Sequence, residues 1–217
     1  MNFHNQIYNE LNRSEFFRSV IGPVQSGDSK FQITHLHQSA RALLIADVWS
    51  RIQRNILVVT ADDIMAEDIW DDLCVLIGRD NTHYLPDLEI LPYEERSPHY
   101  SIRATRLEAL ADAVGERPLS YVLSIRAFLR WMQPLELLKK NIISLSQGQE
   151  YDPAVLISNL VGMGYEADYQ VGKVYQVARR GGILDVFSPP QQKPVRIEFF
   201  GDEIMSIRPF SLATQRS

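Results

Sequence analysis

The most constraining feature of this 217-residue sequence is a change in its hydrophobic pattern near residue 140. Before that point, short apolar runs such as NILVVT (55–60) and SYVLSI (120–125) alternate with stretches of helical spacing. From residue 167 onward the pattern becomes short alternating strands separated by Gly and Pro turns. We therefore expect a parallel α/β layer structure with helices on both faces, followed by a smaller α+β domain.

The first module has the alternating strands and helices of a parallel sheet. Its run at 55–60 is unbroken and apolar, which is typical of a strand covered on both faces. Acidic residues early in the following helix favour its N-terminus, and Gly78 suits its C-terminal end. The spacing predicts helices over 1–20, 38–53, 61–78, 101–114 and 126–132, strands over 55–60, 82–86, 88–92 and 120–125, and a turn-rich link over 22–30.

The second module begins with a predicted strand in NIISLSQGQ (141–149). A helix follows, with Asp152 as its expected cap and Pro153 in its first turn. After the helix, the segments DYQV, VYQVAR, ILDVF, VRIEFF and IMSIRPF are predicted to be short strands. We therefore divide the chain into a lead-in at 1–30, an α/β domain at 31–140 and an α+β domain at 141–217.

Composition and spacing argue against several classes of protein. The net charge of −5 disfavours a protein that wraps nucleic acid, because such a protein needs a basic surface. The single cysteine, Cys74, cannot form an internal disulfide and fits a reducing cytoplasm. The sequence has no metal-ligand spacing and no apolar run of about 18 residues, so we expect neither a metal site nor a membrane span.

An α/β domain of this kind raises the question of a phosphate-binding loop, whose pattern is GxxxxGK[ST]. The candidate segment is HLHQSARA, where His35 and Ala40 occupy the positions of the two glycines. Arg41 and Ala42 replace the lysine and the hydroxyl residue that would meet phosphate and magnesium. We therefore expect a helix N-terminus retained for packing, no bound nucleotide, and no catalysis by this chain itself.

The string RIEFF carries the clearest sign of a binding surface. Side chains alternate across a strand, so Ile197 and Phe199 share one face and can pack inward. Arg196, Glu198 and Phe200 share the other face. A large aromatic side chain beside arginine is typical of interface hot spots. The pattern therefore indicates a docking surface rather than a catalytic pocket.

Two segments resemble a known family. PDLEILPYEERSPHYSIRATRLEAL (86–110) resembles the N-terminal region of bacterial transcription-repair coupling factors. The block RRGGILDVFSPP…PVRIEFFGDEIMSIRPF, within 178–217, is similar to a module that this family shares with the excision-repair helicase subunit UvrB. The resemblance spans roughly residues 30–217. The LPYE…SPH segment and the degenerate loop favour the coupling factors over UvrB.

The resemblance implies a degenerate RecA-like, P-loop-like domain followed by a UvrA-interaction domain, with UvrA as the partner. It also implies that the chain is part of a longer protein. Other regions of that parent would bind RNA polymerase and double-stranded DNA and would use ATP and magnesium in an ATP-dependent DNA translocase. The alternative is a UvrB-like helicase subunit of the excision nuclease.

The resemblance also implies three partner-binding residues. The family's arginine before glycine falls on Arg180, its second arginine on Arg196 and its aromatic on Phe200. The residues alone leave other roles open. Arg180 could be a strand-end charge and Phe200 a core residue, while Arg196 could pair with Glu198 or Asp202.

Overall fold

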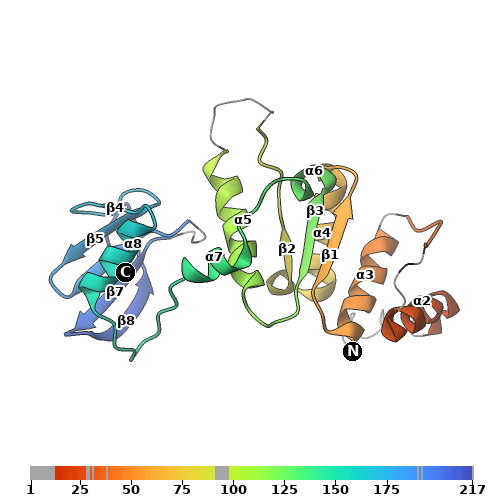
Figure 1. Cartoon of the computed structure of the whole chain (residues 1–217), viewed down its shortest axis with the longest axis horizontal. Coiled ribbons are helices and arrows are strands. Elements are labelled where there is room, and N and C mark those ends of the chain that lie inside the picture. The colour runs from red at the N-terminus through yellow and green to blue at the C-terminus, as the bar shows by residue number, and fades with distance from the viewer. Residues whose placement is uncertain are drawn as a thin grey trace. The chain divides into compact units, whose positions relative to one another are not determined.

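The computed structural model describes residues 13–27, 30, 32–37, 39–90, 98–189, 191 and 193–216. The chain divides into two compact units (Figure 1). The first comprises residues up to 98 and 112–132, and the second comprises residues 99–111 and 133–217.

The first unit contains a three-stranded parallel sheet. Its strands are β1 (Ile56–Thr60), β2 (Thr82–Tyr84) and β3 (Ser120–Ser124), in the spatial order β1-β3-β2. Ser120 of the central strand lies opposite Ile56 on one side and Thr82 on the other. The prediction of a parallel α/β arrangement is confirmed for this unit.

Helices of the first unit pack on this sheet and on each other. A core of small and branched side chains joins α3 and α4 to β3, namely Ala42, Ala46, Ala66, Ile69, Leu73 and Val122. The Asp62 side chain accepts a hydrogen bond from the Met65 N–H at 2.8 Å and caps α4, as residues of this type do at helix starts. The helices are α2 (Glu15–Ser26), α3 (Ser39–Ile52), α4 (Asp63–Ile77), the 3₁₀ turn η1 (Arg79–Asn81) and α6 (Ile125–Phe128).

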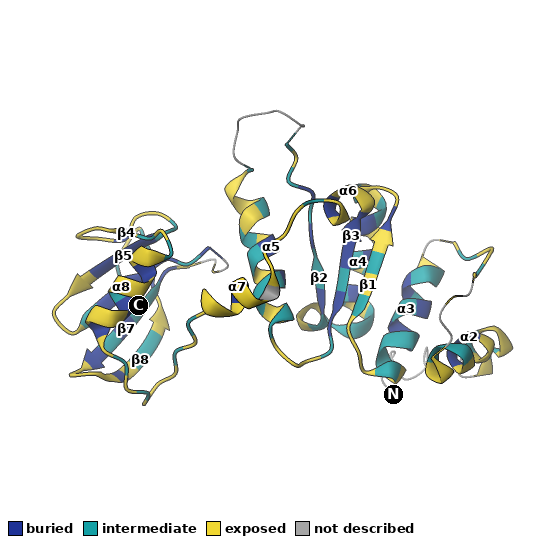
Figure 2. Ribbon diagram, in the orientation of Figure 1, coloured by how far each residue is buried: buried dark blue, intermediate teal, exposed yellow. Residues whose placement is uncertain are grey.

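The expectations for β1 and for the link at 22–30 are wrong in detail. β1 is not covered on both faces, because Leu57 and Val59 are 53% and 43% exposed (Figure 2). β1 is an edge strand, and its side chains alternate, so Val58 packs into the core with α3 and α4 while its neighbours do not. The expected link at 22–30 is also partly helical, since α2 continues through Pro23 to Ser26 and is capped by Gly27, whose φ of 83° suits glycine.

Parts of the remaining expectations lie outside the described residues. These are residues 1–12 of the lead-in, 28–29 of the link, and 91–97 of the LPYE…SPH segment. Residues 88–90, which were expected to be extended, form no strand.

The second unit is built on a five-stranded mixed sheet in the order β4-β5-β6-β7-β8. β4 pairs with β5 in parallel, and the other neighbours are antiparallel. The strands are β4 (Glu166–Ala167), β5 (Gln176–Arg180), β6 (Ile183–Val186), β7 (Val195–Phe200) and β8 (Glu203–Pro209); the helices are α5 (Tyr100–Ala113, most of which belongs to this unit), α7 (Leu135–Lys140) and α8 (Pro153–Gly162).

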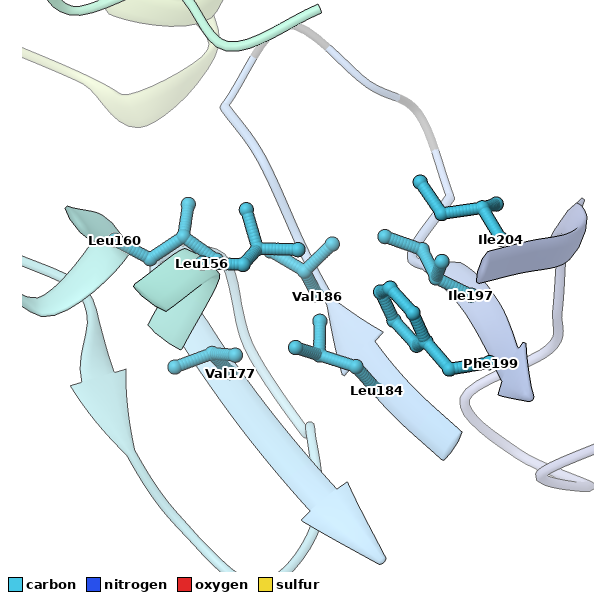
Figure 3. Packing of buried hydrophobic residues seen from close by; sticks show 8 residues of the cluster. All are labelled: Leu156, Leu160, Val177, Leu184, Val186, Ile197, Phe199 and Ile204. Carbon is cyan, nitrogen blue, oxygen red and sulfur yellow. The ribbon is translucent and has the colours of Figure 1, made fainter. Parts of the chain in front are cut away.

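Helix α8 packs on one face of this sheet, which we call the inner face. Leu156 and Leu160 of α8 meet apolar side chains from four strands (Figure 3). The strand residues of this core are Val177, Leu184, Val186, Ile197, Phe199 and Ile204. Burial of this apolar area supplies the main driving force for folding of the unit. It also leaves the alternate residues of β5–β8 on the opposite, outer face.

The expected cap of α8 is confirmed, since Asp152 accepts a hydrogen bond from the Ala154 N–H at 2.7 Å. The strand predicted at 141–149 is wrong. Gly148 turns the chain with a φ of 81°, and its N–H donates to the Ile204 carbonyl at 2.8 Å. The segment therefore runs beside β8 with irregular bonds, and one isolated bridge joins Glu150 to Glu203.

Candidate docking surface

The candidate site lies at the end of the second sheet where the β5–β6 turn meets β7. The Phe199 N–H donates to the Gly182 carbonyl at 2.7 Å. A Cβ on Gly182 would lie only 2.7 Å from the Phe199 carbonyl oxygen, so only glycine allows this approach. Gly181 turns the chain with a φ of 61°. The double glycine thus brings Arg180 to the same end of the sheet as Phe200.

Strand register places the polar side chains of the outer face in rows. Asp185 lies between Ala178 of β5 and Arg196 of β7. In the next row, Ile183 lies between Arg180 and Glu198. Directly opposed side chains on one face of an antiparallel pair are close enough to interact. The register therefore collects two arginines and a carboxylate that lie up to 16 positions apart in the sequence.

A carboxylate, Asp185, lies at the centre of this arrangement and is 1% exposed. Its Oδ1 accepts from the Nε of Arg196 at 2.7 Å, and its Oδ2 accepts from the Nη2 of Arg196 at 2.8 Å. The same Oδ2 also accepts from the Nη2 of Arg180 at 3.1 Å. A buried carboxylate is tolerated when it is paired and fully hydrogen-bonded, and the two-pronged bond from Arg196 meets that need.

Arg196 is itself held on all sides, with a side chain that is 13% exposed. Its Nη1 donates to the Gln215 carbonyl at 3.2 Å, and its guanidinium carbon lies 4.7 Å from the centre of the Phe210 ring. The hydrogen bonds that Arg196 donates to Asp185 raise the pKa of Arg196, so this side chain stays charged. Arg196 therefore ties the central strands to the C-terminal segment.

Arg180 and Phe200 are the accessible members of the predicted set. The Arg180 side chain is 52% exposed and keeps only one hydrogen bond to Asp185, whereas Phe200 is 78% exposed. Phe200 follows Phe199, which packs into the inner core, and strand alternation therefore directs Phe200 to the outer face. An exposed phenyl ring and a half-exposed guanidinium on the same face of a sheet have the composition of a protein contact.

Beside this pair, β7 and β8 carry a second, more exposed ion pair. Glu198 accepts hydrogen bonds from the Ser206 hydroxyl at 2.9 Å and from Arg208. The bond from Ser206 and the nearby Arg208 charge lower the pKa of Glu198. Glu198 is thus paired with Arg208, and Arg196 forms its ion pair with Asp185 rather than with Glu198 or Asp202, the two partners that the sequence left open.

The role of Asp185 was not apparent from sequence reasoning, which treated ILDVF simply as a strand. A usable signal was present, because a charged residue inside a short apolar strand must find a partner if it is buried. Which arginine would meet it depends on cross-strand register. The contacts of Arg196 with Phe210 and Gln215 could not be predicted from the sequence either, since these two residues lie in the segment after β8.

The described residues of the segment at 35–42 in the first unit make packing contacts. Ala42 is fully buried in the core that α3 shares with α4. The Nε of Arg41 donates to the Leu36 carbonyl at 2.9 Å, and its Nη1 lies 3.3 Å from the sulfur of Met65. His35 is exposed with a φ of 62°, and Ala40 is partly buried. Arg41 is thus tethered to its own loop and to α4.

Among the described residues, no cluster of three or more His, Cys, Asp or Glu side chains is arranged to hold a metal ion. Within the same part of the chain, no helix combines the length and apolar character needed to cross a membrane.

Comparison with known proteins finds a recognised domain over the residues of the candidate surface. Residues 143–217 match the UvrB interaction domain family. This range contains the inner core of the second unit and all of the residues around Asp185. The second unit therefore carries an interaction domain of this class, which confirms the resemblance of its strands to the UvrB-like module.

Nearly the whole chain is similar to proteins named transcription-repair-coupling factor. The protein from Myxococcus xanthus is 34% identical over 208 residues, which cover 93% of this chain and 17% of the relative. Those from Staphylococcus epidermidis and Mycobacterium tuberculosis are 30% and 37% identical over 92% and 89% of this chain, and over 18% and 16% of the relatives. The chain is thus similar over nearly its whole length to transcription-repair-coupling factors, and it spans about a sixth of the length of these relatives.

Proposed function

We propose that this chain recruits UvrA through the outer face of its second unit, with Phe200 and Arg180 as the contacting residues. The observation that carries the proposal is that an exposed phenyl ring and a half-exposed arginine anchored to Asp185 lie on the same face of the sheet, within the residues that match the UvrB interaction domain family. A few such residues dominate the energy of most protein interfaces.

The chemistry of the surface favours a protein partner with an apolar socket and carbonyl or carboxylate groups around it. Phe200 would bury its ring in the socket, where removal of apolar area from water provides affinity. Arg180 retains free N–H donors, because only its Nη2 is bonded to Asp185 among the contacts described. Its planar guanidinium can then bond two acceptors on the partner. Arg208, which is also 52% exposed, would add positive charge at the rim.

Capture of purified UvrA on the immobilised chain tests this proposal. The wild-type chain should retain UvrA, and the double variant Arg180→Ala/Phe200→Ala should lose it. Trp131→Ala serves as a matched control, because Trp131 is 98% exposed but lies in the first unit, outside residues 143–217. Equal retention of UvrA by the double variant and the wild type would overturn the proposal.

We propose further that the first unit is a degenerate RecA-like domain that binds no nucleotide. A hollow of about 910 Å³ lies beside the start of α3 and is lined by Arg41 and His37 together with Asp62, Asp68, Asp71 and Asp72. Four carboxylates facing one arginine would repel a triphosphate. Titration with magnesium-ATP in a calorimeter should give no binding heat, and saturable binding would contradict the proposal.

At the level of a longer parent protein, we propose that this module links removal of stalled RNA polymerase to excision repair. The parent would bind RNA polymerase and double-stranded DNA through other regions and would use ATP and magnesium in a separate motor. Support comes from the relatives, whose name is transcription-repair-coupling factor and whose length far exceeds that of this chain. This name favours a coupling factor over a UvrB-like helicase subunit.

A further inference from the structure

We infer that Asp185 is the positioning residue of the docking surface, and that Arg196 acts through Asp185 rather than by direct contact with the partner. The inference rests on the proposed function. It adds that the docking arginine is held in place before the partner arrives, by a carboxylate that the partner cannot reach.

The exposed fractions of Asp185, Arg196 and Arg180 show which of the three side chains a partner can reach. Asp185 is 1% exposed, Arg196 is 13% exposed and Arg180 is 52% exposed. Arg196 uses both sides of its guanidinium on Asp185 and on the Gln215 carbonyl, so it has little left for a partner. Arg180 alone extends from this buried network to solvent.

The charges of Asp185, Arg196 and Arg180 also indicate that Arg180 is the arginine that contacts the partner. Two guanidinium groups and one carboxylate leave a net charge of +1, and the exposed carrier of that charge is Arg180. Because Arg196 satisfies Asp185 with two short bonds, the longer bond from Arg180 at 3.1 Å orients Arg180 without being needed to neutralise the carboxylate.

Holding Arg180 in the free chain reduces the entropy that binding would otherwise cost. An arginine side chain loses substantial rotamer freedom when it is fixed at an interface. A side chain that is already restrained loses less, which is the general benefit of preorganisation. Loss of the Asp185 contact should therefore weaken UvrA binding about three- to tenfold, even though Arg180 itself is unchanged.

Removing the Asp185 carboxylate distinguishes an effect on the position of Arg180 from an effect of the surface charge alone. Asp185→Asn keeps the size of the side chain but removes its negative charge, which makes the surface more positive. If charge alone governed docking to an acidic partner, this variant would bind UvrA more tightly. If Asp185 positions Arg180, the variant should bind more weakly.

The decisive experiment is a double-mutant cycle measured as UvrA affinity of the full chain. Asp185→Asn should weaken binding about three- to tenfold in the wild-type background and should have no further effect in the Arg180→Ala background. Asp87→Asn is the matched control, because Asp87 is a 4% exposed carboxylate held by Arg126 and Arg130 in the first unit. Its UvrA affinity should equal that of the wild type.

Independent, multiplicative effects of Asp185→Asn and Arg180→Ala would overturn the inference, as would wild-type affinity of Asp185→Asn. If Asp185→Asn does not fold, Arg196→Lys takes its place in the cycle, since lysine keeps the charge but not the two-pronged bond. Failure of the proposed function is distinguishable, because Arg180→Ala and Phe200→Ala would then both bind UvrA as the wild type does.

Discussion

The strongest stability prediction concerns Arg196→Ala. The substitution removes both hydrogen bonds from Arg196 to the buried Asp185 carboxylate, the bond to the Gln215 carbonyl and the stacking on Phe210. Breaking a buried ion pair by deleting one partner typically costs about 3–5 kcal/mol. Arg180 still donates to Asp185, so we expect the lower end, about 3 kcal/mol.

The assay must report on the second unit specifically. The three tryptophans, Trp49, Trp70 and Trp131, all lie in the first unit, so tryptophan fluorescence follows that unit alone. Hydrogen exchange of the β6 and β7 amides reports the free energy of opening of the second sheet. Arg196→Ala should accelerate exchange of these amides by about two orders of magnitude, as a loss of about 3 kcal/mol requires.

Arg208→Ala is the matched control for this prediction. Arg208 lies directly opposite Arg196 on β8, but its own ion pair with Glu198 is partly solvent-exposed, and such pairs contribute little. Arg208→Ala should therefore leave the exchange rates of β6 and β7 nearly unchanged. If both variants exchange like the wild type, the buried network does not hold the sheet together and the reasoning is refuted.

Three further predictions concern stability. Gly182→Ala should lower the free energy of unfolding by about 1–3 kcal/mol, measured by urea unfolding followed by circular dichroism, because the new Cβ would clash with the Phe199 carbonyl. Gly162→Ala is the control and should not lower it, because the space around Gly162 is open. Asp152→Ala should cost about 1 kcal/mol in the same assay by removing the cap of α8; unchanged stability would contradict that role. The hydrogen bond from Arg130 lowers the pKa of Asp87, so the ionised Asp87 stabilises the folded first unit above the unfolded pKa of about 3.9, and this stabilisation is lost as the pH falls through the folded pKa. Unfolding followed by tryptophan fluorescence should show that the difference in unfolding free energy between wild type and Asp87→Asn becomes smaller over this pH range. A difference that does not change with pH would refute the prediction.

Local sequence signals predicted much of the fold because they act over short distances. The unbroken run at 55–60 predicted β1, and Asp152 with Pro153 predicted the start of α8. Alternation along RIEFF correctly separated the buried Ile197 and Phe199 from the exposed Phe200. In each case the preference is set by neighbouring residues or by strand period.

The errors arose where the outcome depends on distant parts of the chain. NIISLSQGQ has strand-like composition, but its pairing with β8 is broken by the turn at Gly148. Leu57 is apolar yet exposed, because sheet order makes β1 an edge strand. The partner of Arg196 could not be chosen among carboxylates without register, and register placed Asp185, not Glu198, within reach of the guanidinium.

The central claim is that UvrA docks on the surface formed by Phe200 and Arg180. The most direct measurement is the dissociation constant of UvrA for the Phe200→Ala chain, determined by calorimetry beside wild type and Trp131→Ala. Phe200 is 78% exposed and makes no contribution to the inner core, so its loss leaves folding intact. The account predicts weakening by about 2 kcal/mol, roughly 30-fold, with Trp131→Ala unchanged. Equal affinity of all three chains would contradict it.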